Sequence, residues 1–219
     1  MKRLFLLGAL FFMSVPVMAE TLNIMVFGDS LSAGYRLQAK ESFGSQLEQA
    51  LKKKGYPIQV MNYSKTGETT AGGLERAKSA IFKNPDAVLL ELGVNDALHN
   101  VQLENATHNL QALIDFFKKR DIPVLLIGME LPMSMPTTYR DGFKKMYEDL
   151  AFENELLLYP FFMKGLWTEN GVQKSEKYFL DDKFHPSSKG VQIMVSHILP
   201  VAEQFIQEDV ADVTVAKCK

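Results

Sequence analysis

The sequence has a single cysteine, Cys218, which is the penultimate of its 219 residues. No internal disulfide can form, so the fold has to be stabilised by a packed core. The composition, 47% hydrophobic and 23% charged, suits one globular domain that buries such a core. A thiol this close to a chain terminus is also a poor candidate for a catalytic nucleophile.

Long apolar runs are absent after the first residues, so no later stretch has the roughly 20 apolar residues of a membrane-spanning helix. The start of the chain has the basic, apolar and small-residue regions of a secretory signal peptide: Met1-Lys2-Arg3, an apolar stretch over 4–13, and Val17-Met18-Ala19. We predict cleavage after Ala19 and a periplasmic or secreted protein. An uncleaved anchor is the alternative, although the apolar run is short for a span.

The sequence also lacks an excess of positive charge. Removing residues 1–19 takes away Lys2 and Arg3 and leaves 22 basic against 26 acidic residues, a net charge near −4. This balance argues against a nucleic-acid partner. His99, His108 and His197 show no metal-ligand spacing such as H-x-x-x-H, so we expect packing or solvated roles for them and neither a metal nor another cofactor.

After residue 20, short apolar runs rich in β-branched residues alternate with longer stretches of helical period. The short runs predict strands over 22–27, 58–63, 87–92, 123–128 and 156–159. The longer stretches predict helices over 43–54, 72–82, 105–120, 138–154 and 188–207. This alternation predicts one domain over residues 20–219, an α/β/α sandwich of three layers with a five-stranded parallel sheet of flavodoxin-like order.

In a parallel sheet of this kind, ligands bind at the carboxyl ends of the strands. The first predicted strand runs directly into Gly28-Asp29-Ser30-Leu31. Ser30 can therefore be a nucleophile at a strand end, or it can simply cap a turn. The nucleophile elbow G-x-S-x-G of the α/β-hydrolases is not present, because Ser32 stands at the position of the second glycine.

A second motif, Asp182-Lys183-Phe184-His185-Pro186, precedes the last predicted helix. The proline disfavours helical backbone at His185 and so predicts a loop. A carboxylate three residues earlier can hold one ring nitrogen and leave the other free as a general base. The alternative is a loop histidine paired with a surface acid.

Two further residues follow predicted strands: Gly67 comes after 58–63, and Asn95 comes after 87–92. Glycine allows the backbone to approach a reacting carbonyl closely, and an asparagine amide can donate to the negative charge that develops there. Each taken alone can belong to an ordinary turn. Together with Ser30 and His185, they supply every role that acyl transfer requires.

In residue type, order and spacing, these four positions resemble the SGNH or GDSL hydrolases over nearly the whole chain after residue 20. The segments Glu91-Leu92-Gly93-Val94-Asn95-Asp96 and Leu158-Tyr159-Pro160-Phe161-Phe162 are most similar to a periplasmic branch with thioesterase, lysophospholipase and arylesterase activity. The resemblance implies a serine esterase that hydrolyses acyl esters and thioesters through an acyl-enzyme. Its substrates would be small-molecule or lipid acyl compounds. We expect the protein to be a monomer that contacts lipid only transiently.

By that resemblance, Ser30 is the nucleophile, His185 is the general base and Asp182 is its orienting acid. The family pattern D-x-x-H selects Asp182 over the adjacent Asp181. The oxyanion hole would consist of the backbone amides of Ser30 and Gly67 and the side chain of Asn95.

The resemblance also implies supporting and substrate-binding positions. Asp29 and Asp96 would support loop geometry, and residues 97–101 would form a mobile lid over the acyl site. The acyl chain would contact a set of residues in this lid and in the loop over 132–136: Ala97, Leu98, Met133 and Met135. That loop, Pro132-Met133-Ser134-Met135-Pro136, departs from the shorter turn of arylesterase relatives, so the acyl-chain preference stays open.

Two alternatives remain at this point. A carbohydrate O-acetylesterase could use the same triad on acetylated sugars. A binding protein could keep the fold without the chemistry, although the complete set of candidate residues speaks against that.

Overall fold

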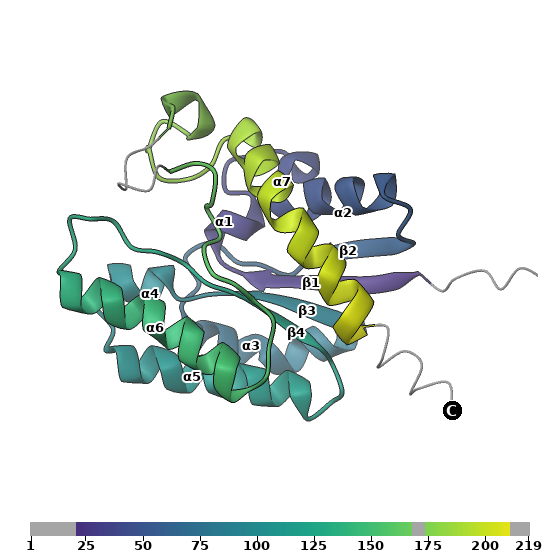
Figure 1. Ribbon diagram of the computed structural model, residues 1–219, viewed down its shortest axis with the longest axis horizontal. Helices are drawn as coiled ribbons and strands as arrows, with labels where there is room; N and C mark the ends of the chain where they lie inside the picture. The colour runs from purple at the N-terminus through teal and green to yellow at the C-terminus, as the bar shows by residue number, and fades with distance from the viewer. Residues whose placement is uncertain (1–20, 168–173, 211–219) are drawn as a thin grey trace, which may run out of the picture.

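A computed structural model describes residues 21–167 and 174–210. Its centre is a five-stranded parallel sheet in the order β2-β1-β3-β4-β5, as predicted (Figure 1). The strands are β1 (Leu22–Gly28), β2 (Ile58–Asn62), β3 (Ala87–Glu91), β4 (Val124–Ile127) and β5 (Leu158–Tyr159). The predicted signal peptide over residues 1–19 and Cys218 lie outside the described residues.

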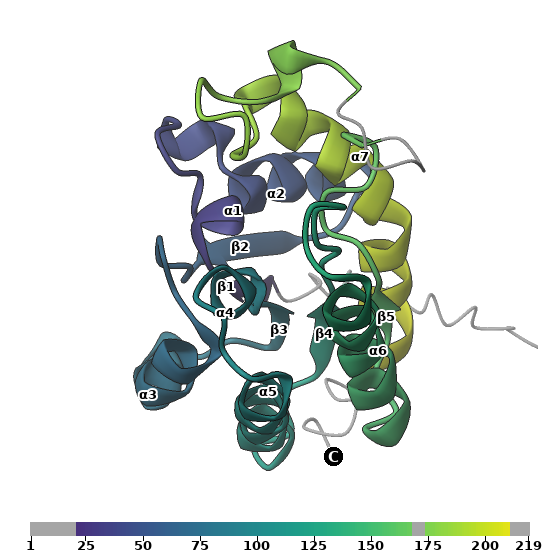
Figure 2. The same cartoon turned by 90° about the vertical axis from the view of Figure 1, so that its left-hand side faces the viewer.

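Helices cover both faces of the sheet and complete the three predicted layers. One face carries α2 (Phe43–Lys53) and α7 (Ser188–Phe205), and the other carries α3 (Thr70–Ala80), α5 (Leu103–Lys118) and α6 (Thr137–Glu153) (Figure 2). A π-helix over Ile206–Val210 extends α7, and short 3-10 helices lie at Ala39–Glu41, Ile81–Lys83 and Glu176–Tyr178. None of the helices in the described part of the chain has the length and apolar character needed to cross a membrane.

The burial of the strands explains why their sequences read as continuous apolar runs. β3 and β4 are buried at every position, because helices cover both faces of the inner sheet. β2 lies at an edge of the sheet and keeps only Ile58 fully buried. The strongly apolar strands therefore belong to the middle of the sheet. Because all the strands are parallel, their carboxyl ends lie together on the same side of the molecule.

Every predicted strand and helix is present, with each boundary within two residues of the predicted one. Two short helices were not predicted: α1 (Ser30–Ala33) and α4 (Val94–Leu98). They are too short to display an apolar period, and they directly follow β1 and β3. α3 begins at Thr70, earlier than predicted, because the Thr69 side chain caps it by accepting from Gly72 N–H at 3.2 Å.

Candidate active site

Ser30 is the first residue of α1, so it stands where β1 turns sharply into a helix. Asp29 caps this helix, its Oδ1 accepting a hydrogen bond from Leu31 N–H at 2.9 Å. Gly34 ends it at φ +82°, a left-handed conformation that glycine adopts without strain. The turn leaves Ser30 only 5% exposed at the carboxyl edge of the sheet.

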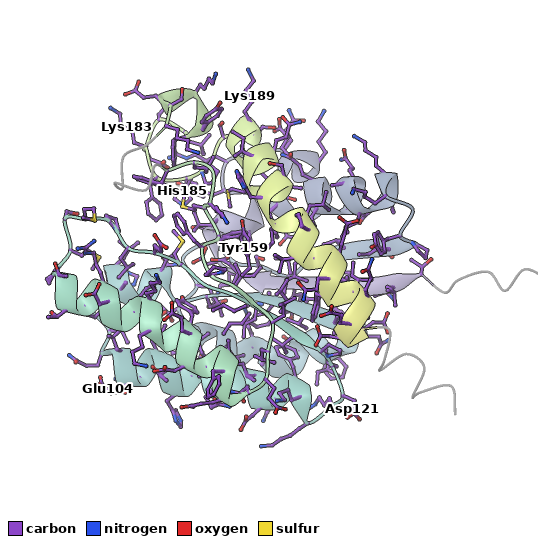
Figure 3. The ribbon with its side chains drawn as sticks, in the orientation of Figure 1. Glu104, Asp121, Tyr159, Lys183, His185 and Lys189 are labelled. Atoms are coloured by element: carbon purple, nitrogen blue, oxygen red, sulfur yellow. The ribbon has the colours of Figure 1, made fainter. Side chains whose placement is uncertain are left out.

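The loop before α7 brings His185 to Ser30 across 155 positions of sequence. His185 Nε2 lies 2.9 Å from Ser30 Oγ, and His185 Nδ1 lies 2.8 Å from Asp182 Oδ2. Figure 3 shows His185 at the end of the molecule where α7 begins. With the imidazole proton on Nδ1, the Ser30 hydroxyl donates to Nε2, so the three side chains form one hydrogen-bonded line.

Asp182 is fixed by the backbone as well as by the imidazole. Its Oδ1 accepts from the N–H groups of His185 at 2.9 Å and Phe184 at 3.0 Å. Partial burial opposes ionisation, but these backbone bonds and the imidazole outweigh it and lower the Asp182 pKa below 3.8. The carboxylate is therefore charged at neutral pH and able to stabilise an imidazolium. The adjacent Asp181 is exposed and makes no hydrogen bond to the imidazole in the described structure.

Aromatic rings hold the imidazole from two sides. The Tyr35 ring centroid lies 4.3 Å from that of His185, and the Phe184 ring packs edge-on at 5.1 Å. The loop itself is closed by an N–H···O bond from Leu180 to His185 O at 2.8 Å. The orientation of the imidazole is thus set by packing as well as by Asp182.

Two backbone amides at the site have no acceptor within the described residues. Ser30 N–H is in the first turn of α1, where helix amides lack intrahelical partners. Gly67 N–H lies in the loop after β2, at φ +76° with open space where a Cβ would be. Glycine is needed there for its backbone conformation, and the free N–H can serve a ligand.

The Asn95 side chain reaches the same region, but its amide is already engaged. Nδ2 donates to Asp29 Oδ2 and to the carbonyl oxygen of Glu68, both at 3.0 Å. These two bonds use both hydrogens of the amide. Donation to an oxyanion therefore requires Asn95 to exchange one of them, a condition that the sequence did not reveal.

An ion pair that sequence reasoning missed holds the Gly67 loop. Arg76 Nε donates to the buried Glu68 carboxylate, while its Nη1 donates to Tyr63 O at 2.7 Å and its Nη2 to Gly28 O at 3.3 Å. The guanidinium also lies 3.9 Å from the Phe27 ring centroid. Arg76 thereby connects the end of β1 to the loop between β2 and α3, which it contacts on both sides of Gly67, at Tyr63 and at Glu68. An arginine inside the apolar period of α3 was the available signal.

Two buried carboxyl groups lie beneath the Ser30 turn. Glu91 Oε2, at the end of β3, accepts from Ser32 Oγ at 2.8 Å and from Asp29 N–H at 3.2 Å. Burial, together with the charge of Asp29, raises the Glu91 pKa well above 4.5. Burial likewise raises the pKa of Asp29 to about 7. Both groups support the loop, Asp29 as expected and Glu91 in addition.

Asp96 has the supporting place expected of it. Its Oδ2 accepts from Thr70 N–H at 2.8 Å and its Oδ1 from Thr70 Oγ1 at 2.6 Å. Asn109 Nδ2 donates to the same hydroxyl at 3.1 Å. The start of α3 is thereby anchored to α4, which carries Asn95.

The family model described as GDSL-like Lipase/Acylhydrolase matches residues 26–193. The chain belongs to this family. An arylesterase of Vibrio mimicus is 34% identical over 212 residues, covering 96% of each protein. The Escherichia coli K12 protein named thioesterase 1/protease 1/lysophospholipase L1 is 32% identical, covering 85% of this chain and 86% of the relative. A crystal structure of TesA superposes with a TM-score of 0.76 at 27% identity, covering 83% of this chain and 98% of that one.

This GDSL-family chain has a cavity of about 550 Å³ that crosses the carboxyl ends of β3, β4 and β5. Ser30 and His185 do not line it, but Val94 and Phe184, the chain neighbours of Asn95 and His185, do. Its walls are mainly apolar and include Val94, Leu98, Met129, Met133, Phe161 and Phe184. Such a cavity suits an apolar chain that is attached to a carbonyl held at Ser30.

Two of the four expected acyl contacts line this cavity. Leu98 and Met133 do so and are 51% and 62% exposed. Ala97 is instead buried in the core, because the helical phase of α4 turns it inward while Leu98 faces out. Met135 packs against the core from the loop before α6 and does not line the cavity.

The three histidines outside the triad motif are all exposed. His99 follows α4, and His108 lies on α5. His197, on α7, differs in lining the cavity. Within residues 21–167 and 174–210, no three His, Cys, Asp or Glu side chains are grouped to hold a metal ion.

Proposed function

We propose that this chain hydrolyses carboxylic ester and thioester bonds by acyl transfer through Ser30. The observation that carries the proposal is the continuous line from Ser30 Oγ through His185 to Asp182, with contacts of 2.9 Å and 2.8 Å. His185 Nε2 takes the hydroxyl proton as Ser30 Oγ attacks the carbonyl carbon. The leaving alcohol or thiol then receives that proton, and an acyl-enzyme forms.

Deacylation repeats the same steps with water as the nucleophile. His185 removes a proton from water, which attacks the acyl carbon, and returns it to Ser30 Oγ as the acid departs. Throughout, the Asp182 carboxylate stabilises the charged imidazole. The free amides of Ser30 and Gly67 would donate to the oxyanion, and Asn95 would join them by giving up a bond to Asp29 or to Glu68 O.

The substrate class rests on the relatives and on the cavity. The relatives' names include arylesterase and thioesterase/lysophospholipase, and the mainly apolar cavity that Val94 and Phe184 line, next in sequence to Asn95 and His185, gives an acyl chain a place to lie. Each buried methylene contributes up to about 0.8 kcal/mol, which is nearly fourfold in kcat/KM where the contact persists in the transition state. We therefore propose substrates with acyl chains longer than acetyl.

A chain-length series tests this substrate class. We would measure kcat/KM for p-nitrophenyl esters from acetate to palmitate, below their aggregation limits, with acyl-coenzyme A thioesters alongside. The rate constant should rise with length until the cavity is filled. A steady fall of kcat/KM from acetate onward would contradict binding of the acyl chain in the cavity and would favour a deacetylase. It would leave the proposed role of Ser30 unchanged.

We also propose that the enzyme acts outside the cytoplasm, in the periplasm or beyond, as a monomer that meets lipid only transiently. The support is the signal-peptide pattern over residues 1–19. Cell fractionation followed by N-terminal sequencing should find a mature chain that starts at Glu20. Full-length protein in the cytoplasmic fraction would contradict the proposal.

A further inference from the structure

We propose that the end of the cavity distant from Ser30 is an anion subsite. The enzyme would then favour acyl substrates that carry a phosphate or carboxylate about 14 Å from the reacting carbonyl, the distance from β1 to β5 across the sheet. This inference rests on the proposed function and adds to it a charge requirement.

The two ends of the cavity can be told apart by the strands that lead to them. Val94 and Phe184 are chain neighbours of Asn95 and His185, so they mark the reactive end. Lys164 follows β5, which is three strands away from β1 in the sheet. Neighbouring strands lie about 4.8 Å apart, so the end of β5 lies about 14 Å from the end of β1, where Ser30 stands.

The distal end brings two lysines to the same wall. Lys174 N–H donates to Leu166 O at 2.9 Å, which sets its backbone beside the segment that carries Lys164. Gly165, at φ +92°, packs so closely on α7 that an added Cβ would lie 2.3 Å from the His197 ring. The segment is thus pressed against α7, with both lysines lining the cavity.

The electrostatics at His197 agree with that placement. Desolvation, followed by the charges of Lys164 and Lys174, lowers the His197 pKa below 6.5. His197 is therefore neutral at pH 7 and leaves the positive field to the lysines. Neither lysine has a carboxylate within ion-pair distance in the part of the chain that the structure describes.

Two further charged residues line the cavity, and they differ in sign. Arg140, on α6, donates to Met133 Sδ and Thr137 Oγ1, while its Nε is buried without a partner. Among the described residues that line the cavity, Glu130 is the only carboxylate. Three cations thus face one acid on largely apolar walls, in a chain whose formal net charge is −2. Apolar surroundings strengthen the attraction of such cations for an anion.

Two pairs of substrates would separate the possible sources of the anion. Decanoyl-coenzyme A and decanoyl-N-acetylcysteamine share an acyl chain, but only the first carries phosphates. The mono-p-nitrophenyl ester of decanedioic acid and p-nitrophenyl decanoate differ only in a carboxylate at the far end of the chain. The readout for each pair is the ratio of kcat/KM for the anionic member to that for the neutral one.

The wild-type protein would be compared with Lys164→Gln, Lys174→Gln and the double variant. Both side chains are exposed, so the replacements should fold. In at least one pair of substrates, the kcat/KM ratio should fall about fivefold for each lysine replaced, which is the effect of a partly solvated charge pair. The fall should be smaller at high salt, because salt screens the attraction. The pair that responds identifies the anion as a leaving-group phosphate or a chain-end carboxylate.

Two matched variants sharpen the test. Glu130→Gln should raise the same ratio, since it removes an acid that lines the cavity. Lys78→Gln, on the exposed face of α3, makes the same charge change far from the cavity and should leave the ratio unaltered. Unchanged ratios for both pairs in the lysine variants would overturn the subsite. Failure of the wild type to hydrolyse even the neutral members would instead overturn the proposed function.

Discussion

The buried Asp29 carboxyl beside Ser30 makes the stability of this protein depend on pH in an unusual direction. Burial raises the pKa of Asp29 from 3.8 to about 7, against the opposing hydrogen bonds from Leu31 N–H and Asn95. Between these two pH values, the folded protein holds a proton that the unfolded chain has released. Raising the pH therefore favours unfolding.

The size of the effect follows from the two pKa values. They differ by roughly three pH units, and each unit corresponds to about 1.4 kcal/mol, so the full effect is about 4 kcal/mol. This stabilisation is complete below pH 3.8 and is lost as the pH rises through about 7. Glu91 acts in the same direction, because burial raises its pKa as well.

The test is urea unfolding of wild type and Asp29→Asn at pH 4.5 and pH 8. The variant cannot titrate at this position, so the stability of the wild type relative to the variant should fall by about 3 kcal/mol across this range. Glu75→Gln removes an exposed acid from α3 and should show no such change. An equal difference between wild type and Asp29→Asn at both pH values would refute the reasoning.

Three further predictions concern the site and its support. Asp182→Asn should lower kcat by about 10⁴, because the imidazole loses its orienting carboxylate, whereas Asp181→Asn should cost little; steady-state kinetics showing the reverse order would contradict the triad. Asn95→Ala should lower kcat by about 10² to 10³ with KM nearly unchanged, and a pure KM effect would assign it to substrate positioning instead. Arg76→Met should cost about 3 kcal/mol in urea unfolding, because the buried Glu68 carboxylate loses its closest cation and keeps only the exposed Lys65 at 3.7 Å; a loss below about 1 kcal/mol would contradict this.

The sheet and the catalytic candidates were predictable because their signals are local. A buried parallel strand is a short apolar run, and a site residue follows directly where the run ends, as Ser30 and Asn95 do. Asp182 and His185 are three residues apart, so their contact is also encoded within a few positions. The distance of 155 positions between Ser30 and His185 is then bridged by the topology, which gathers these loops at one edge.

The features that were missed depend on partners far away in sequence or on helical phase. An arginine inside the apolar period of α3 marks Arg76 as unusual, but it does not show that Arg76 pairs with Glu68 or that it reaches Gly28 O, 48 positions away. Ala97 was expected to contact substrate because α4 has only five residues, too few to reveal which side faces the core. The two engaged hydrogens of Asn95 likewise depend on the three-dimensional position of acceptors on two other loops.

The central claim is that His185 and Asp182 activate Ser30 as a nucleophile. A fluorophosphonate probe reacts with serines of this kind, and mass spectrometry of the digested protein locates the modified residue. We predict labelling at Ser30 in the wild type, none in Ser30→Ala, and strongly slowed labelling in His185→Ala. Ser30→Ala should also lower kcat by a factor on the order of 10⁶. Labelling at a different residue, or substantial hydrolysis by purified Ser30→Ala, would contradict the claim.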